Sequence, residues 1–180
     1  MSQSVSRDCM SEIAPFTQAE ALAMASRHKQ LRLTSCFQSA PEMWLKLKGV
    51  IRLIDYPEQS NPLMDGKGYT PFPNGGVKVY GRKRVYFSKQ HFDPPYVGMH
   101  ERFLTELKCG NPIVVGLPVA GNHHAYLLYA TKGSNNYRLI SKTSPLPGHP
   151  SVTVEDEMAP YLQRQAVVDC LFMSRPKDRQ

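Results

Sequence analysis

The second half of the chain consists of short apolar runs separated by turn residues. PIVVGLPV (112–119), HAYLLYAT (124–131) and NYRLISKT (136–143) follow one another, with Gly- and Asn-bearing turns between them. Short runs rich in β-branched and aromatic residues, bounded by such turns, are typical of antiparallel strands. Two later runs, 152–154 and AVVDCLFM (166–173), are further strand candidates. This half of the chain therefore predicts an antiparallel sheet.

The first half of the chain carries helical patterns instead. Residues 17–29 are helix-prone, and Thr17 and Glu20 have the spacing of a capping box, in which each side chain satisfies a free amide of the first turn. From Cys36 onward, apolar residues recur at helical spacing. This pattern predicts a second helix from near Cys36 to Lys48, where a glycine ends it.

The start of this second helix is open on the sequence alone. Pro41 lacks an amide hydrogen and its ring clashes with the carbonyl four residues earlier, so it disfavours a helix that begins much before it. Ser39 and Glu42 form another capping box around this proline, which would begin the helix after Cys36. An irregular first turn at Cys36 and a later start at Ser39 are both compatible with the pattern.

The middle of the chain contains a connection, a basic segment and a third helical pattern. Residues 55–76 are rich in Pro, Gly and Asn and predict a long connection. KVYGRKRVYFSK (78–89) predicts a hairpin with lysines and arginines on its open face. A short helix is expected over 100–108, with Gly110 as its C-terminal cap. Helices thus precede an antiparallel sheet, which is an α+β order.

Length and the N-terminal residues indicate the domain organisation. A chain of 180 residues has the size of one domain. We expect residues 1–15, which are polar, to form a loose segment and residues 16–180 to form a single domain. The first residues lack the continuous apolar segment of a secretory signal peptide, and no apolar run is long enough to span a membrane. We therefore expect synthesis in the cytoplasm and no membrane span.

Charge and cysteine spacing limit the partners and cofactors. The net charge of +7 suits nucleic acid, an anionic envelope or an acidic protein, and does not choose among them. We interpret the basic hairpin as a solvated face and do not expect a nucleic acid partner. The 4 cysteines lie far apart without a CxxC pair, which argues against a zinc ribbon and, in a leaderless chain, favours reduced thiols. We expect neither a metal nor a cofactor.

Cys36 is the candidate nucleophile. A thiol at a helix N-terminus and beside an imidazole becomes reactive, and the reaction then needs donors for the developing oxyanion. The side-chain amide of Gln30, six positions upstream, and the backbone N–H of Cys36 can supply such donors. GNHHAYLLYATKG places His124 at the opening of an apolar strand, directly before Ala125, while His123 is expected to shape the turn.

These residues resemble the papain-like cysteine protease superfamily. Its signature has a Gln six residues before a nucleophilic Cys, which is preceded by Ser and followed by an aromatic residue, as in Gln30, Ser35, Cys36 and Phe37. The helix, "G-x-P" strand, His-Ala strand start and hairpin partner of the second half resemble the sheet of the family. The resemblance covers roughly residues 18–173 and is greatest to the compact bacterial branch, which includes effector proteases and bacteriocin-processing peptidases.

The resemblance implies a role for each matching residue. Cys36 would be the nucleophile, His124 the base and Gln30 the oxyanion donor, with N-terminal helices carrying the Cys packed on a C-terminal antiparallel sheet carrying the His. The family orients its imidazole through an Asn or Asp on the next strand. Alignment of NYRLISKTSP with that strand puts Lys142 in this slot, and a lysine cannot accept the imidazole N–H. Neighbouring Ser141 and Thr143 could accept weakly, and Asn135, Asn136 or Asp169 could do so if the fold brings one of them near.

The function that we expect is cleavage of a protein substrate by a bacterial effector or toxin. A small basic protease without a leader suits delivery into a target cell by a dedicated secretion system, and such a protein can have a cognate inhibitor or immunity protein. Two alternatives stay open: a catalytically degenerate papain-like domain that only binds a partner, and an amidase that acts on peptidoglycan stems. The absent acidic residue and the basic hairpin favour the binding domain.

Overall fold

The computed structural model describes residues 11–60, 76–80, 82–144, 148–174 and 177–178. The first half contains two helices, a hairpin and a third helix. Their bounds are α1 Gln18–Arg27, α2 Cys36–Leu47, β1 Gly76–Tyr80, β2 Lys83–Phe92 and α3 Met99–Lys108. The second half is mainly strand, with bounds β3 Ile113–Val119, β4 Asn122–Thr131, β5 Tyr137–Thr143, β6 Val152–Glu157, α4 Ala159–Gln163, β7 Val168–Met173 and β8 Lys177–Asp178.

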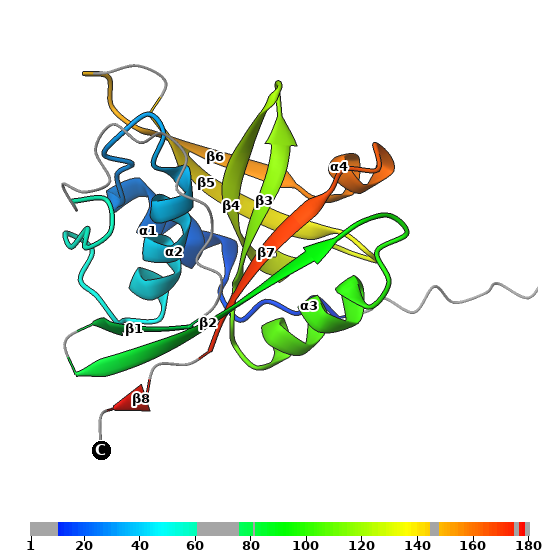
Figure 1. The fold of residues 1–180 in the computed structure, drawn as a ribbon, viewed down its shortest axis with the longest axis horizontal. Coiled ribbons are helices and arrows are strands. Elements are labelled where there is room, and N and C mark those ends of the chain that lie inside the picture. Colours follow the sequence, from blue (N-terminus) through cyan, green and yellow to red (C-terminus); the bar gives the residue numbers. More distant parts are fainter. Residues whose placement is uncertain (1–10, 61–75, 81, 145–147, 175–176, 179–180) are drawn as a thin grey trace, which may run out of the picture.

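The strands form one antiparallel sheet in the order β1-β2-β7-β3-β4-β5-β6, with β8 pairing with β2 off this path (Figure 1). The predicted α+β order, with helices preceding the sheet, is therefore confirmed, as are the hairpin and the strands expected from residue 112 onward. Two short elements, α4 and β8, were not expected from the sequence. Most of the predicted connection 55–76 and the predicted loose segment 1–15 lie outside the described residues.

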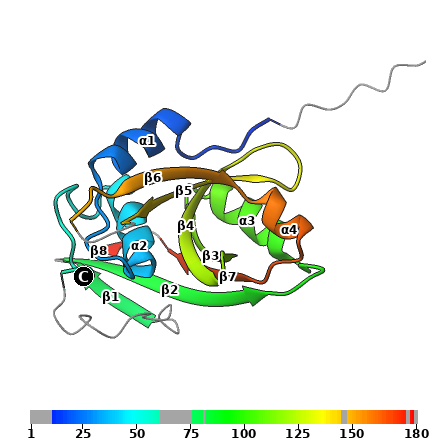
Figure 2. The same ribbon diagram turned by 90° about the horizontal axis from the view of Figure 1, so that it is seen from above.

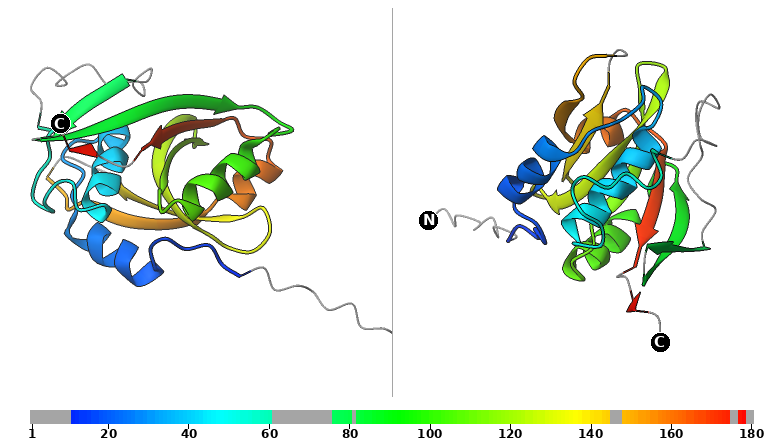
Figure 3. Two further views of the ribbon diagram at one scale, coloured as in Figure 1. Left: turned by 90° about the horizontal axis from the view of Figure 1, so that it is seen from below. Right: turned by 90° about the vertical axis from the view of Figure 1, so that its left-hand side faces the viewer.

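Apolar side chains from opposite faces of the central strands form two cores. Val114 and Leu127 belong to a cluster with α1 and α2, whereas their neighbours Val115 and Leu128 belong to a cluster with α3 and α4. This alternation is the two-residue period of a strand, and it explains why β3 is apolar along its length and β4 is apolar from Ala125 to Ala130. The central strands accordingly pass between α2 and α3 (Figure 2 and Figure 3).

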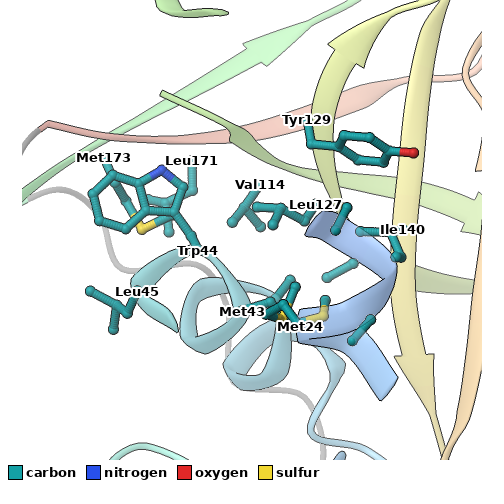
Figure 4. Packing of buried hydrophobic residues seen from close by; sticks show 14 of the residues in the cluster. Met24, Met43, Trp44, Leu45, Val114, Leu127, Tyr129, Ile140, Leu171 and Met173 are labelled. Carbon is teal, nitrogen blue, oxygen red and sulfur yellow. The ribbon is translucent and has the colours of Figure 1, made fainter. Parts of the chain in front are cut away.

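Trp44 anchors α2 to the sheet. It is fully buried among the side chains of the first cluster, close to Leu171 and Met173 (Figure 4). Its indole Nε1 donates a hydrogen bond to the carbonyl of Pro112 at 3.0 Å, directly before β3. A buried tryptophan contributes a large apolar area and a single hydrogen-bond donor. Here the apolar area is buried and the donor has an acceptor. Trp44 is therefore a core residue of the α2–sheet contact.

Helix α2 begins at Cys36, so the alternative start at Ser39 is wrong. Pro41 lies inside the helix, and every residue from Cys36 to Lys46 is buried. An internal proline costs about 3 kcal/mol, whereas each large apolar side chain contributes about 1.5–3 kcal/mol on burial. The burial of this helix on the sheet therefore outweighs the lost backbone hydrogen bond. Ser39 bonds His28 at 2.9 Å instead of capping a helix.

Candidate active site

The candidate active site lies where β4 and β5 separate. Pairing between these strands is assigned from Thr131↔Tyr137 to Leu127↔Ile140, whereas β5 stays paired with β6 as far as Thr143↔Val152. Figure 1 shows the β3–β4 hairpin rising away from β5 and β6 at this end. A cavity of about 720 Å³ is found here, and the N-terminus of α2 lies against it. We call it the Cys36 cavity. It is lined by Leu33, Thr34, Cys36, Phe37, Val119, Asn122, His123, His124, Tyr126, Thr143 and Val154.

Cys36 is the first residue of α2, and its side chain is only 8% exposed. Burial raises the pKa of the thiol, while backbone hydrogen bonds at Ala125, Phe37 and Cys36 itself act to lower it. The free N–H groups at a helix start favour a negative charge in the same way. The contact with Ala125 places the sulfur against β4, at the residue that follows His124.

His124 reaches the same cavity from the other face of the sheet. It shares this face with Tyr126, and the two rings lie perpendicular to each other at 4.8 Å between centroids. The pKa of Tyr126 is raised by burial and, to a smaller extent, by the nearby thiol of Cys36. The gap between β4 and β5 therefore lets a group on α2 approach side chains of the opposite face.

The imidazole of His124 is neutral in this setting. Burial lowers its pKa to about 4, and Nε2 is buried with no hydrogen-bond partner within the described part of the chain. The adjacent His123 is exposed and also lines the cavity. The structure thus brings Cys36 and both histidines to one cavity, with His124 half-buried and His123 exposed.

The structure does not bring Gln30 to this cavity. Gln30 is 5% exposed, and its Nε2 donates to the carbonyls of Arg32 at 2.7 Å and Leu33 at 3.1 Å. Both amide hydrogens therefore hold the turn that leads to Cys36. The donors left beside the thiol are backbone N–H groups at the start of α2.

Lys142 lies elsewhere than the resemblance predicts. Ile140, two residues earlier on β5, belongs to the core on the α2 side, so Lys142 points to that side as well. Thr143 has the opposite orientation and lines the Cys36 cavity. Ser141 lies on the same face as Thr143, fully buried, and its Oγ has no partner among the described groups. Of the β5 residues, Thr143 therefore lines the same cavity as His124, and neither Asn nor Asp occurs on this strand.

Sequence reasoning missed Gln59, which supports the turn before Cys36. It is fully buried and accepts hydrogen bonds from Leu31 N at 2.8 Å and from Ser35 Oγ at 3.0 Å. A glutamine within a Pro- and Asn-rich connection gives no sequence signal of such a role.

In the described ranges, no group of three or more His, Cys, Asp or Glu side chains is placed to hold a metal ion. None of the helices there is both long and apolar enough to cross a membrane. No family model, no curated protein and no solved structure matches the chain.

Proposed function

We propose that this protein is a papain-like cysteine protease in which Cys36 is the nucleophile and His124 the general base. The observation that carries the proposal is the shared cavity: Cys36 at a helix N-terminus and His124 on a strand line the same walls, with the thiol against Ala125. Two segments 88 positions apart thereby supply the two groups of a thiol hydrolase.

The pair starts as a neutral thiol and a neutral imidazole, because burial raises one pKa and lowers the other. As the sulfur forms a bond to the substrate carbonyl carbon, the thiol proton moves to the imidazole of His124. Backbone N–H groups at the start of α2 can donate to the resulting oxyanion. The C–N bond then breaks, and the imidazolium gives its proton to the leaving amine.

Water completes the cycle. It attacks the thioester carbon while His124 removes its proton, and the C–S bond breaks as the proton returns to the sulfur. No co-reactant other than water is consumed. The T-shaped contact with Tyr126 orients the imidazole by packing.

The substrate class and biology of the proposal rest on the sequence resemblance alone. We propose a protein substrate, a bacterial effector or toxin role with delivery by a dedicated secretion system, and a cognate inhibitor or immunity protein as a partner. The second candidate function is a binding module without catalysis. Two observations favour it: the neutral Cys36–His124 pair and the engagement of the Gln30 amide by backbone carbonyls.

Digestion of a proteome-derived peptide library tests catalysis without a known substrate. The wild-type protein should generate new peptide termini that share a sequence preference, while Cys36→Ala generates none and unfolds at the same temperature. Cys170→Ala is a matched control, because it removes another buried thiol that does not line the Cys36 cavity. Absence of new termini with the wild-type protein, or equal cleavage by Cys36→Ala, would contradict the assignment.

A further inference from the structure

A second cavity, of about 820 Å³, is lined in part by the segment that precedes α2. Its walls come from Ser26 and residues 28–33, from the end of β5 with Ser144, and from residues 148–151. Lys29, Arg32, Lys142 and His149 contribute basic side chains to the lining, and none of the described lining residues is acidic. We call it the Lys142 cavity. A concave surface lined by positively charged groups attracts anions.

No interaction within the described part of the chain explains why Lys142 is buried. Its side chain is 4% exposed, and burial lowers the pKa of its ammonium. Within the described part of the chain, no carboxylate raises that pKa, and no hydrogen bond or ion pair to the ammonium is present. Burying a lysine without a counter-charge is costly, so such lysines are rare.

Lys46 shows how this fold satisfies a buried lysine. Lys46 is 6% exposed, and its Nζ lies 2.8 Å from His28 Nδ1 and 3.7 Å from the centre of the Tyr56 ring. Burial lowers the pKa of Lys46 to about 8, and the carboxylates of Glu42 and Asp55 act to raise it. Lys142 has no equivalent set of partners among the described groups. The missing counter-charge can come from outside the chain.

The other groups of the cavity suit the same kind of ligand. Lys29 and His149 are exposed at the cavity, and Ser144 and Ser151 bring hydroxyls. His28 also lines it, but both of its ring nitrogens already have partners, Ser39 Oγ and Lys46 Nζ. Several cations and hydroxyls around this largely buried lysine, which lines the cavity, suit an ion with more than one negative charge.

We propose that the Lys142 cavity binds a small phosphate-bearing anion, with the ammonium of Lys142 as its central contact. The cavity, of about 820 Å³, leaves room for a diphosphate or an organic phosphate ester as well as for inorganic phosphate. Leu33 lines both this cavity and the Cys36 cavity, and Lys142 directly precedes Thr143. A bound anion would therefore lie behind the turn that leads to Cys36. The site does not depend on catalysis by Cys36.

Binding of inorganic pyrophosphate, measured by calorimetry at constant ionic strength, tests the site directly. The wild-type protein should bind, and Lys142→Met should bind at least about tenfold more weakly, which is the usual loss for one charge-assisted contact. Lys132→Met is the matched control, because Lys132 pairs with Glu157 away from the cavity and its loss should leave affinity unchanged. Equal affinity in Lys142→Met, or no binding by the wild-type protein, would overturn the proposal.

Two further experiments cover a Lys142 variant that does not fold and a membrane-bound source of the anion. Lys142→Met removes an unpaired buried charge and should melt at the same or a higher temperature in the absence of ligand. If it fails to fold, Lys29→Met combined with His149→Ala, both at exposed positions, should weaken pyrophosphate binding instead, and unchanged affinity would contradict the site. Vesicles containing a phosphoinositide separate a membrane headgroup from a free ligand. Binding to vesicles but not to pyrophosphate would overturn the small-anion proposal.

Discussion

Gln59 and Glu42 are joined inside the protein by a hydrogen bond from the amide of the glutamine to the carboxylate, and both side chains are fully buried. Glu42 also accepts from the backbone N–H groups of residues 58 and 59, at 2.9 and 3.2 Å. Since Gln59 in turn holds Leu31 and Ser35, the middle of α2 is tied to the turn that precedes Cys36. The position of the thiol therefore depends on this pair.

Gln59→Leu should lower the free energy of unfolding by about 2 kcal/mol or more, because it leaves part of a buried carboxylate without a donor. Chemical denaturation measures the change. The swapped double variant, Glu42→Gln with Gln59→Glu, restores one amide and one carboxylate and should recover most of the loss. The losses caused by Glu42→Gln alone and by Gln59→Glu alone are measured for comparison. If the double variant lost as much stability as these two single variants added together, the direct hydrogen bond would not be the stabilising feature.

His124→Ala should lower kcat/KM by about 100-fold or more, within the range for loss of a general base. His123→Ala is the internal comparison, since this neighbour is exposed and lines the same cavity, and its effect should be small. Values of kcat/KM are measured for both variants on one peptide from the library. If His123→Ala caused the larger loss, His123 rather than His124 would be the general base.

The acid limit of activity should be low. His124 has to be neutral to accept the thiol proton, and burial lowers its pKa to about 4 from the ordinary value of 6.5. The profile of kcat/KM against pH should therefore stay flat on the acid side down to about pH 4 and fall below it. An acid limb near pH 6.5 would mean that the imidazole is solvated in the working enzyme.

His28 predicts a loss of stability in acid. Its pKa is lowered to about 3, first by burial and then by the positive charges of Lys46 and Lys142. A histidine whose folded pKa is depressed stabilises the protein fully above 6.5, and this contribution is lost as the pH falls towards 3. His28→Gln keeps hydrogen-bonding groups but does not titrate. Its unfolding free energy should depend less on pH between 6.5 and 3 than that of the wild-type protein, and parallel curves would refute the assignment.

The fold was largely predictable because its signals are local. Strands β3, β4 and β5 and helices α1 and α3 follow from apolar period and turn residues, and the capping box of Thr17 and Glu20 is present as expected. Cys36 at the helix start was one of the two alternatives that the sequence left open. The expectation that His123 shapes the turn is wrong: β4 already begins at Asn122, and His123 pairs with Pro118, because the β3–β4 ladder extends up to the tight turn.

Features that depend on three-dimensional context were not predictable. The pairing of β4 with β5 is shifted between Leu128 and Ala130, which breaks a simple alignment of the two strands. One residue of register reverses the face of every side chain, and this is why Thr143 rather than Lys142 lines the Cys36 cavity. The hydrogen bonds of Gln30 likewise depend on the geometry of its turn, which spacing alone does not reveal.

The alkylation rate of Cys36 by iodoacetamide tests the central claim most directly. Labelling of the native protein near neutral pH, mapped by mass spectrometry, compares Cys36 with two internal references, the exposed Cys109 and the buried Cys170. If His124 activates the thiol, Cys36 should react much faster than Cys170, and His124→Ala should slow Cys36 while leaving Cys109 unchanged. A Cys36 that stays unlabelled until denaturation, or that reacts equally fast in His124→Ala, would contradict the Cys36–His124 pair and favour the binding module.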